Sequence, residues 1–392
     1  MGRAWPVLIL LAFTQFCASW GSLTIIGVQV EMREGLNVSG GAIAGLIWSY
    51  SFAIAVGAIL AQVLIGHWPR RAVLLFSMSL LGFGACFLGL AQTWEQAMTA
   101  RVLMAVGGCS VMPTTTVIAA SLVPESQRPA ALSVVFTGLT ASLVLALPIA
   151  SLVSSAAGWR AAWFVSGGSA FVAVIGLAWG VPAGIRGTRA TLKSIRAVLA
   201  DRATALTILT TLLLITGGFM TYAMISFWLV EVTQTPRWAV IPVLLASGIA
   251  STAGNVFSSP ILKVLGRDST IIAGMASAAV CFAILWTIPH ILWLSYPAMI
   301  LMGFGWSLCL APLQSRLVQT SGPRSQLALA LNASAFFGGQ GFGAVFGGAV
   351  YESFGPVLLP LFSILVLGGA TILFSLAKGI KSVAETEAEN PS

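Results

Sequence analysis

One arginine, Arg101, lies within a long apolar stretch, near one end of it, and is the one clear case of an ionisable group there. A charged side chain surrounded by hydrocarbon is energetically unfavourable, so residues of this kind commonly serve function and have a dedicated partner. Two roles are open for Arg101. It could act on a ligand or a proton, or it could bond to helix ends and hold the helices together. We favour the first.

Acidic residues are missing from the middle of every apolar stretch. A proton antiporter needs a carboxylate that binds and releases a proton as its exposure changes. Glu31, near the end of the first stretch, is the nearest candidate, while Glu34 and Glu231 are similarly peripheral. We therefore expect proton coupling to involve Glu31 and Arg101. Uniport, or coupling through a charged substrate, remains the alternative.

Amide and aromatic side chains inside the apolar stretches are the candidates for substrate binding. Together with one arginine and no carboxylate, they favour neutral, amphipathic or anionic ligands over organic cations. Each one alone is more often a packing or interhelical hydrogen-bonding residue. We rank Gln15, Arg101, Tyr222 and Trp306 first. The full set is Gln15, Trp20, Tyr50, Arg101, Tyr222, Trp228, Asn255, Trp306, Asn332 and Gln340.

Signatures of metal binding and catalysis are absent from the sequence. The five cysteines lie in apolar segments without C-x-x-C spacing, and His67 and His290 are the only histidines. We interpret the cysteines as packing residues. There is no G-x-S-x-G, no H-E-x-x-H, no acidic pair and no phosphate-binding Gly-Lys-Ser/Thr loop. We predict a protein that is not an enzyme and has no metal or cofactor.

The composition is that of a membrane protein. Hydrophobic residues make up 58% of the 392 positions and charged residues 8%, whereas a soluble domain has roughly a quarter of its residues charged. We predict an all-α polytopic protein with twelve transmembrane helices, each long enough to cross a bilayer. The first stretch has no small-x-small cleavage site, so we expect it to be retained. The spans are 5–29, 40–65, 72–91, 97–123, 130–154, 160–182, 204–230, 238–262, 269–289, 291–317, 326–350 and 355–377.

The basic residues predict the orientation of these helices. With the N-terminus inside, fifteen Lys and Arg residues lie on the cytoplasmic side and only Arg33, Arg160 and Arg237 lie outside. We therefore expect a multi-pass protein of the bacterial inner membrane with both termini in the cytoplasm. The net charge of +8 reflects this topology, so no nucleic-acid partner is predicted. The expected partners are a small-molecule substrate and the lipid bilayer, and we expect a monomer.

The two halves of the chain repeat. Trp68-Pro69-Arg70 corresponds to Leu265-Gly266-Arg267 at an offset of 197 residues, and Arg128 corresponds to Arg324 at 196. Gly158-Trp159 corresponds to Gly355-Pro356, again at 197. Three matches in order, each at the equivalent loop, are improbable by chance. Parallel six-helix halves around a midplane site are the layout of a major-facilitator transporter.

A resemblance to the major facilitator superfamily covers nearly the whole chain. The stretch from Gln62 through Arg70 and Arg71 resembles its loop signature G-x-L-a-D-R-x-G-R-R. The stretch from Phe136 through Pro148 to Arg160 resembles the fifth helix of proton-coupled exporters. The sequence is most similar to the drug:proton antiporter and arabinose-efflux-permease-like branch. This resemblance implies twelve helices in two six-helix halves, with the first, fourth, seventh and tenth helices facing a central cavity.

The resemblance also implies roles for individual residues. Arg101 resembles the fourth-helix arginine of R-x-x-q-G, which is associated with proton transfer or substrate attraction, although Met104 and Ala105 replace the Gln and Gly. Glu31 lies about where this branch has a glutamate. Gly66 replaces the signature aspartate that latches the cytoplasmic side, and Lys263 does not restore it in the second half. Arg70, Arg71 and Arg267 then remain as gating candidates or as simple positive-inside anchors.

Small residues on the fifth and eleventh helices point to motion. Gly138 and Pro148 are the candidates in the first half, and a glycine run from Gly338 to Gly348 is the counterpart in the second. The resemblance places these helices at the interface between halves, where they could act as hinges. Tight static packing would leave the same pattern.

These observations predict two six-helix bundles, 1–182 and 204–378. Between them lies a basic segment, 183–203, which is either an interfacial helix or a solvated linker, and the tail 379–392 is predicted to be disordered. We predict a secondary transporter that exports a small organic molecule (a drug, sugar or metabolite) by alternating access, in exchange for protons. An uptake permease or facilitator is the first alternative, and a non-transporting receptor of the same fold is the second.

Overall fold

The computed structural model describes residues 4–124, 127–186 and 192–380. These ranges contain fifteen α-helices and no β-strand, which confirms the predicted all-α fold. The chain divides into two compact units, Met1–Arg189 and Ala190–Ser392. The tail beyond residue 380 and the linker positions 187–191 lie outside the described residues.

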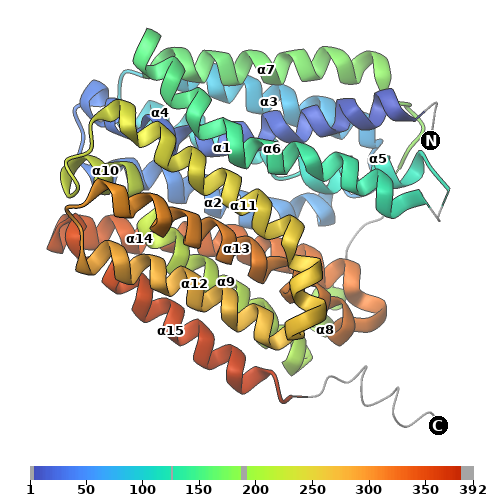
Figure 1. Cartoon of the computed structure of the whole chain (residues 1–392). Coiled ribbons are helices and arrows are strands. Elements are labelled where there is room, and N and C mark those ends of the chain that lie inside the picture. Colours follow the sequence, from blue (N-terminus) through green and yellow to red (C-terminus); the bar gives the residue numbers. More distant parts are fainter. Residues whose placement is uncertain (1–3, 125–126, 187–191, 381–392) are drawn as a thin grey trace. The chain divides into compact units, whose positions relative to one another are not determined.

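The described part of the N-terminal unit contains seven helices, labelled α1 to α7 in Figure 1. Its first helix packs mainly against the last two, and its third helix packs against the fourth and the seventh. The helices are α1 (Trp5–Leu36), α2 (Gly40–Leu64), α3 (Arg70–Leu90), α4 (Trp94–Gly108), α5 (Val111–Ser121), α6 (Arg128–Ala157) and α7 (Trp159–Gly180).

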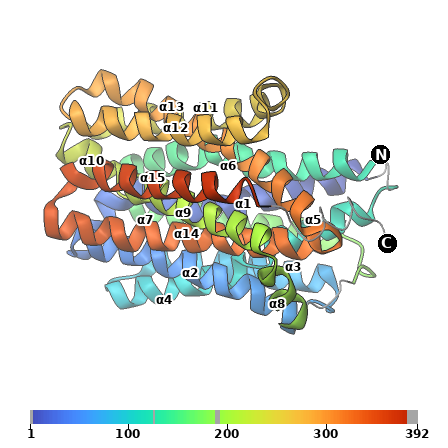
Figure 2. The same ribbon diagram turned by 90° about the horizontal axis from the view of Figure 1, so that it is seen from below.

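The C-terminal unit, whose helices α8 to α15 are labelled in Figure 2, repeats this arrangement. The pairs α9–α14 and α12–α15 correspond to α1–α6 and α3–α7, and α11–α13 corresponds to α2–α4. Its helices are α8 (Leu192–Ala200), α9 (Arg202–Tyr222), α10 (Ile225–Glu231), α11 (Arg237–Leu265), α12 (Arg267–Thr287), α13 (Leu292–Ser321), α14 (Ser325–Phe354) and α15 (Leu359–Ala377), with short 3-10 helices η2 (Gly322–Arg324) and η3 (Pro356–Leu358).

The repeat extends to single backbone angles. Gly158 and Gly355, which join the last two long helices of their units, have φ angles of 83° and 80°. Positive φ strains any residue that carries a Cβ, which explains glycine at both places. The sequence match between these two positions therefore reflects a shared turn.

Side-chain caps start several of the helices. The Ser39 hydroxyl accepts a hydrogen bond from the Ala42 N–H at the start of α2, and Thr93 does the same for Gln96 at the start of α4. The Asp201 carboxylate caps α9 by accepting from the Thr204 N–H. Such residues satisfy N–H groups that have no partner within the helix.

Eleven helical segments of the described chain are long and apolar enough to cross a membrane. The helix α14 occupies the predicted eleventh span and has 30 residues, but it is not one of these eleven segments. Two predicted spans are broken, the fourth at Cys109 between α4 and α5 and the seventh at Ala223 between α9 and α10. The adjacent glycines Gly107 and Gly108 weaken the helix at the first break, whereas nothing in the local sequence explains the second.

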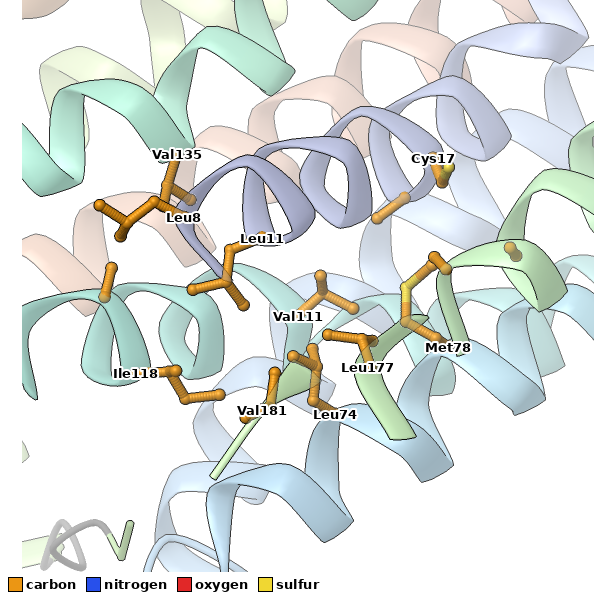
Figure 3. Close-up of a cluster of buried hydrophobic side chains, with 14 of the residues drawn as sticks. Leu8, Leu11, Cys17, Leu74, Met78, Val111, Ile118, Val135, Leu177 and Val181 are labelled. Atoms are coloured by element: carbon orange, nitrogen blue, oxygen red, sulfur yellow. The ribbon is translucent and has the colours of Figure 1, made fainter. Parts of the chain in front are cut away.

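A cluster of apolar side chains joins five helices of the N-terminal unit (Figure 3). It includes Leu11 of α1, Met78 of α3, Val111 of α5 and Leu177 of α7, all of them buried. In lipid, close packing rather than removal from water holds such helices together. This packing holds α1 against α5. Gln15 lies on α1, and its hydrogen-bond partner Thr115 lies on α5.

Candidate functional site

The Arg101 side chain crosses from α4 to two other helices. Its Nε donates to the Leu46 carbonyl of α2 at 3.0 Å, and its Nη1 donates to the Gly21 carbonyl of α1 at 3.2 Å. The residue is only 1% exposed. Guanidinium groups present several donors in a fixed plane, which suits simultaneous contact with two carbonyls. Arg101 therefore ties α1, α2 and α4 together.

Aromatic rings cover the faces of this guanidinium group. Its Cζ lies 4.0 Å from the centroid of Tyr50 on α2 and 5.7 Å from that of Trp163 on α7. Both distances allow attraction between the cation and the ring face. Within the described chain, no carboxylate is among the partners of Arg101. The positive charge is thus balanced there by carbonyl dipoles and rings rather than by an acidic side chain.

Two further residues that the sequence predicts to bind substrate, Gln15 and Trp20, lie on α1, the helix that also contains Gly21. Gln15 is buried, and its Oε1 accepts a bond from the Thr115 hydroxyl of α5 at 3.4 Å. Trp20 is also buried, and its indole Nε1 has no hydrogen-bond partner in the described chain. The structure thus brings Arg101 and Tyr50 into contact and places Trp20 next to the residue that binds Arg101. Gln15 lies more than a turn earlier on α1.

In the C-terminal unit, Tyr222 and Trp306 meet. Their ring centroids are 6.3 Å apart, and Phe219 completes the group at 5.8 Å from Tyr222 and 6.4 Å from Trp306. Both Tyr222 of α9 and Trp306 of α13 are half-buried. A Cβ on Gly218 would lie 2.6 Å from the Trp306 ring, so this glycine makes room for the indole. These two residues are among the four that the sequence ranks first, but the sequence does not show that their rings lie together.

The other predicted residues of this unit do not join that pair. Trp228 of α10 is fully buried, and Asn332 of α14 is buried with an Oδ1 that has no partner in the described chain. Asn255 of α11 is exposed and Gln340 of α14 is half-buried. Within the described residues, no hydrogen bond or ring contact links these four to Tyr222 or Trp306. Their role in binding stays a prediction.

The loop between α2 and α3 is fastened to the end of α7. The Arg70 guanidinium donates to the Gly66 carbonyl at 2.9 Å, and the Arg70 backbone N–H donates to the Ile185 carbonyl at 2.8 Å. Arg71 donates to the Ala178 carbonyl in the last turn of α7. Cations stabilise the carboxyl ends of helices. The signature arginines thus hold the loop and α7 together without the missing aspartate.

Arg101 is not the only buried arginine of the described chain, because Arg70 and Arg316 are buried as well. Arg316 of α13 is 3% exposed, and its Nη2 donates to the Ala377 carbonyl at the end of α15 at 2.8 Å. Its Nη1 lies 3.7 Å from the Asp268 carboxylate at the start of α12. Asp268 also pairs with Arg267 at 3.4 Å, and Arg267 donates to Gln319. Because Arg316 falls in the last turn of its predicted span, sequence reasoning assigned it to topology alone.

The predicted coupling and hinge residues also have defined places. Glu31 is half-buried on α1, whereas Glu34, on the same helix, is exposed. Gly138 of α6 lies directly against the Ala12 backbone of α1, within one unit. Pro148 lies inside α6, beside the Leu147 carbonyl that approaches Gly27. Coupling by Glu31 and hinge motion at Gly138 and Pro148 stay predictions.

Comparison with known families decides to which family this chain belongs. The family model for the Major Facilitator Superfamily matches residues 11–326. The chain belongs to this superfamily. It is therefore a membrane transporter and not an enzyme, as the sequence predicted.

Relatives within the superfamily extend over nearly the whole chain. The inner membrane transport protein YdhP of Escherichia coli K12 is 27% identical over 371 residues, which cover 93% of this chain and 94% of that protein. A protein named probable sugar efflux transporter in Helicobacter pylori J99 is 22% identical over 354 residues, covering 90% and 88%.

Solved superfamily transporters share the fold. A mutant form of the nucleoside transporter NupG matches with a TM-score of 0.73 at 15% identity, covering 95% of this chain and 98% of that one. A bacterial homologue of the human lysosomal transporter Spinster, inward-facing and unoccupied, matches with a TM-score of 0.68 at 14% identity, covering 96% and 95%. At such identities the likeness concerns the fold alone.

Proposed function

We propose that this superfamily member exports a small organic molecule by alternating access, in exchange for protons. The proposed proton exchange rests on Glu31, the half-buried carboxylate of α1. The observation that carries the proposed solute class is the chemistry of the two interiors. One holds Arg101 among carbonyls and rings, the other holds the Tyr222–Trp306 pair, and no described Asp or Glu side chain is buried in either. Such interiors suit neutral, amphipathic or anionic solutes. The name of the Helicobacter pylori relative supports efflux and makes sugars the first class to test.

Transport itself is tested in proteoliposomes with an imposed pH gradient. The solutes are a panel of monosaccharides together with neutral and anionic amphipathic compounds. Gradient-driven movement of one class of solute supports the proposal. Solute that moves opposite to the protons indicates exchange, whereas solute that moves with the protons indicates an uptake permease. A solute that raises the thermal midpoint of the purified protein but never crosses the vesicle membrane would instead indicate a receptor.

Trp306 is expected to bind the transported solute. Trp306→Ala should raise the KM for that solute roughly tenfold, which corresponds to about 1.4 kcal/mol of lost contact. Trp306→Phe, which keeps a ring against Gly218, should have a smaller effect. The matched control is Trp293→Ala on the same helix, where the side chain is 78% exposed and stacks on Tyr296. Equal KM values for the two alanine variants would remove Trp306 from the binding site.

Glu31 is expected to couple solute movement to protons. Glu31→Gln mimics the protonated carboxyl group permanently, so the pH gradient should no longer drive transport, while solute exchange without a gradient should persist. Glu34→Gln provides the control, because Glu34 lies on the same helix and is exposed. Gradient-driven uptake that survives Glu31→Gln at the wild-type rate would contradict the assignment of Glu31.

A further inference from the structure

Basic side chains gather at one end of the C-terminal unit. A series of contacts defines this end: Thr204 at the start of α9 bonds to Thr320 at the end of α13, and Arg316 joins the start of α12 to the end of α15. The opposite end carries the exposed carboxylates Glu231 and Glu352. The cations at the basic end that are exposed or half-buried are Arg196, Arg202, Lys263, Arg267, Arg324 and Lys378.

The short helix α8 lies at this basic end, beside the start of α9 (Figure 2). Its Val198 is 2% exposed and packs into the unit, whereas Leu199 is 48% exposed and Arg196 is exposed. The Arg324 guanidinium holds α8 in place by donating to the Ala197 carbonyl at 3.4 Å. The helix is therefore attached along one side and presents a leucine and an arginine on the other.

The position of α8 along the chain indicates its depth in the lipid bilayer. Arg202, the first residue of α9, is also the first residue of the candidate span Arg202–Glu231. A helix that ends two residues before a membrane crossing lies at the level of the lipid headgroups. Short helices with basic and apolar residues side by side bind there, since their apolar side chains enter the acyl region and their cations meet phosphate.

We propose that Arg196, Leu199, Arg202 and Arg324 form an α8 basic surface that binds anionic phospholipid headgroups. Guanidinium groups match phosphate oxygens with paired hydrogen bonds. Leu199 identifies a lipid rather than a soluble anion as the occupant, because a free phosphate gains nothing from an exposed leucine. Lipid binding at this surface does not depend on what the protein transports.

The test measures binding of phosphatidylglycerol and phosphatidylcholine to the purified full-length protein in detergent, by native mass spectrometry. We expect the wild type to retain phosphatidylglycerol in preference. Arg196→Gln with Arg202→Gln should weaken that binding roughly thirtyfold, about fivefold for each basic residue near the headgroups. This double variant leaves the Arg324–Ala197 contact in place. Lys263→Gln with Lys378→Gln removes two cations from the same end and should leave binding near the wild-type value.

Two further arms separate a lipid from other anions. Leu199→Asp should weaken binding of phosphatidylglycerol, and glycerol phosphate, which has the headgroup charge without acyl chains, should not compete. The proposal is overturned if the arginine double variant binds like the wild type, or if the lysine double variant loses as much. It is also overturned if glycerol phosphate competes fully while Leu199→Asp has no effect, since the site would then take a soluble anion.

Discussion

Gly138→Ala is expected to destabilise the N-terminal unit by at least about 3 kcal/mol, the upper end of the usual range for overpacking. A Cβ at this position would fall on the carbonyl oxygen of Ala12, with the Ala12 carbonyl carbon at 2.7 Å. A side chain could rotate away from the added methyl group, but a backbone carbonyl in α1 cannot. The two helices α1 and α6 would have to separate along their contact.

The measurement is the thermal unfolding midpoint of the purified protein in one detergent, followed by tryptophan fluorescence. Gly168→Ala is the matched control, because Gly168 lies on α7 of the same unit and a Cβ there would meet nothing within 4 Å. That change should be neutral or stabilising by up to about 1 kcal/mol, the difference in helix propensity. Ala12→Gly should not rescue Gly138→Ala, because the collision is with the backbone. Equal midpoints for the two alanine variants would show that α1 and α6 are not in close contact.

The same physical reason explains the glycine run of the second half. In α14, glycines four residues apart approach backbone atoms of α9 that are also four residues apart, as expected for helices packed through small residues. The seam between the first and fifth long helices is thus built alike in both units. These glycines therefore serve close packing within each unit, and their motion as hinges stays a prediction. The pairs in the C-terminal unit are Gly339 with Leu212, Gly343 with Thr216 and Gly347 with Met220.

The fold was predictable because hydrophobicity, loop chemistry and the repeat all act locally along the chain. Arg101 was predictable because a lone charge in an apolar stretch is conspicuous. Its partners were not, since the Leu46 and Gly21 carbonyls are backbone groups that carry no sequence signal. Arg316 was missed for the opposite reason: an arginine near a span boundary looks like a topology signal. Only the structure shows that its side chain is buried and bonded to the carbonyl of Ala377 at the end of α15.

Arg101→Met is expected to abolish most transport while leaving the protein folded. Methionine keeps much of the side-chain volume and removes the charge and both hydrogen bonds to the carbonyls. Hydrogen bonds from charged donors contribute about 1.5–3 kcal/mol each. Part of that lost stability is regained, because the variant no longer bears the free-energy cost of burying a charged group away from water. We expect a lower thermal midpoint but a monodisperse protein, and a transport rate reduced roughly tenfold or more, the equivalent of one such bond.

Arg160→Met is the control that separates a functional arginine from a structural one. Arg160 also donates to a backbone carbonyl, that of Ala91 at 3.1 Å, and lies 4.2 Å from the Trp159 ring centroid. Initial rates are compared in proteoliposomes that contain equal amounts of folded protein. If Arg101 acts on the solute or the proton, only Arg101→Met loses transport, and the solute no longer raises its thermal midpoint. If Arg101 only ties helices, the two variants should transport alike, because each has lost one carbonyl-binding cation from the same unit.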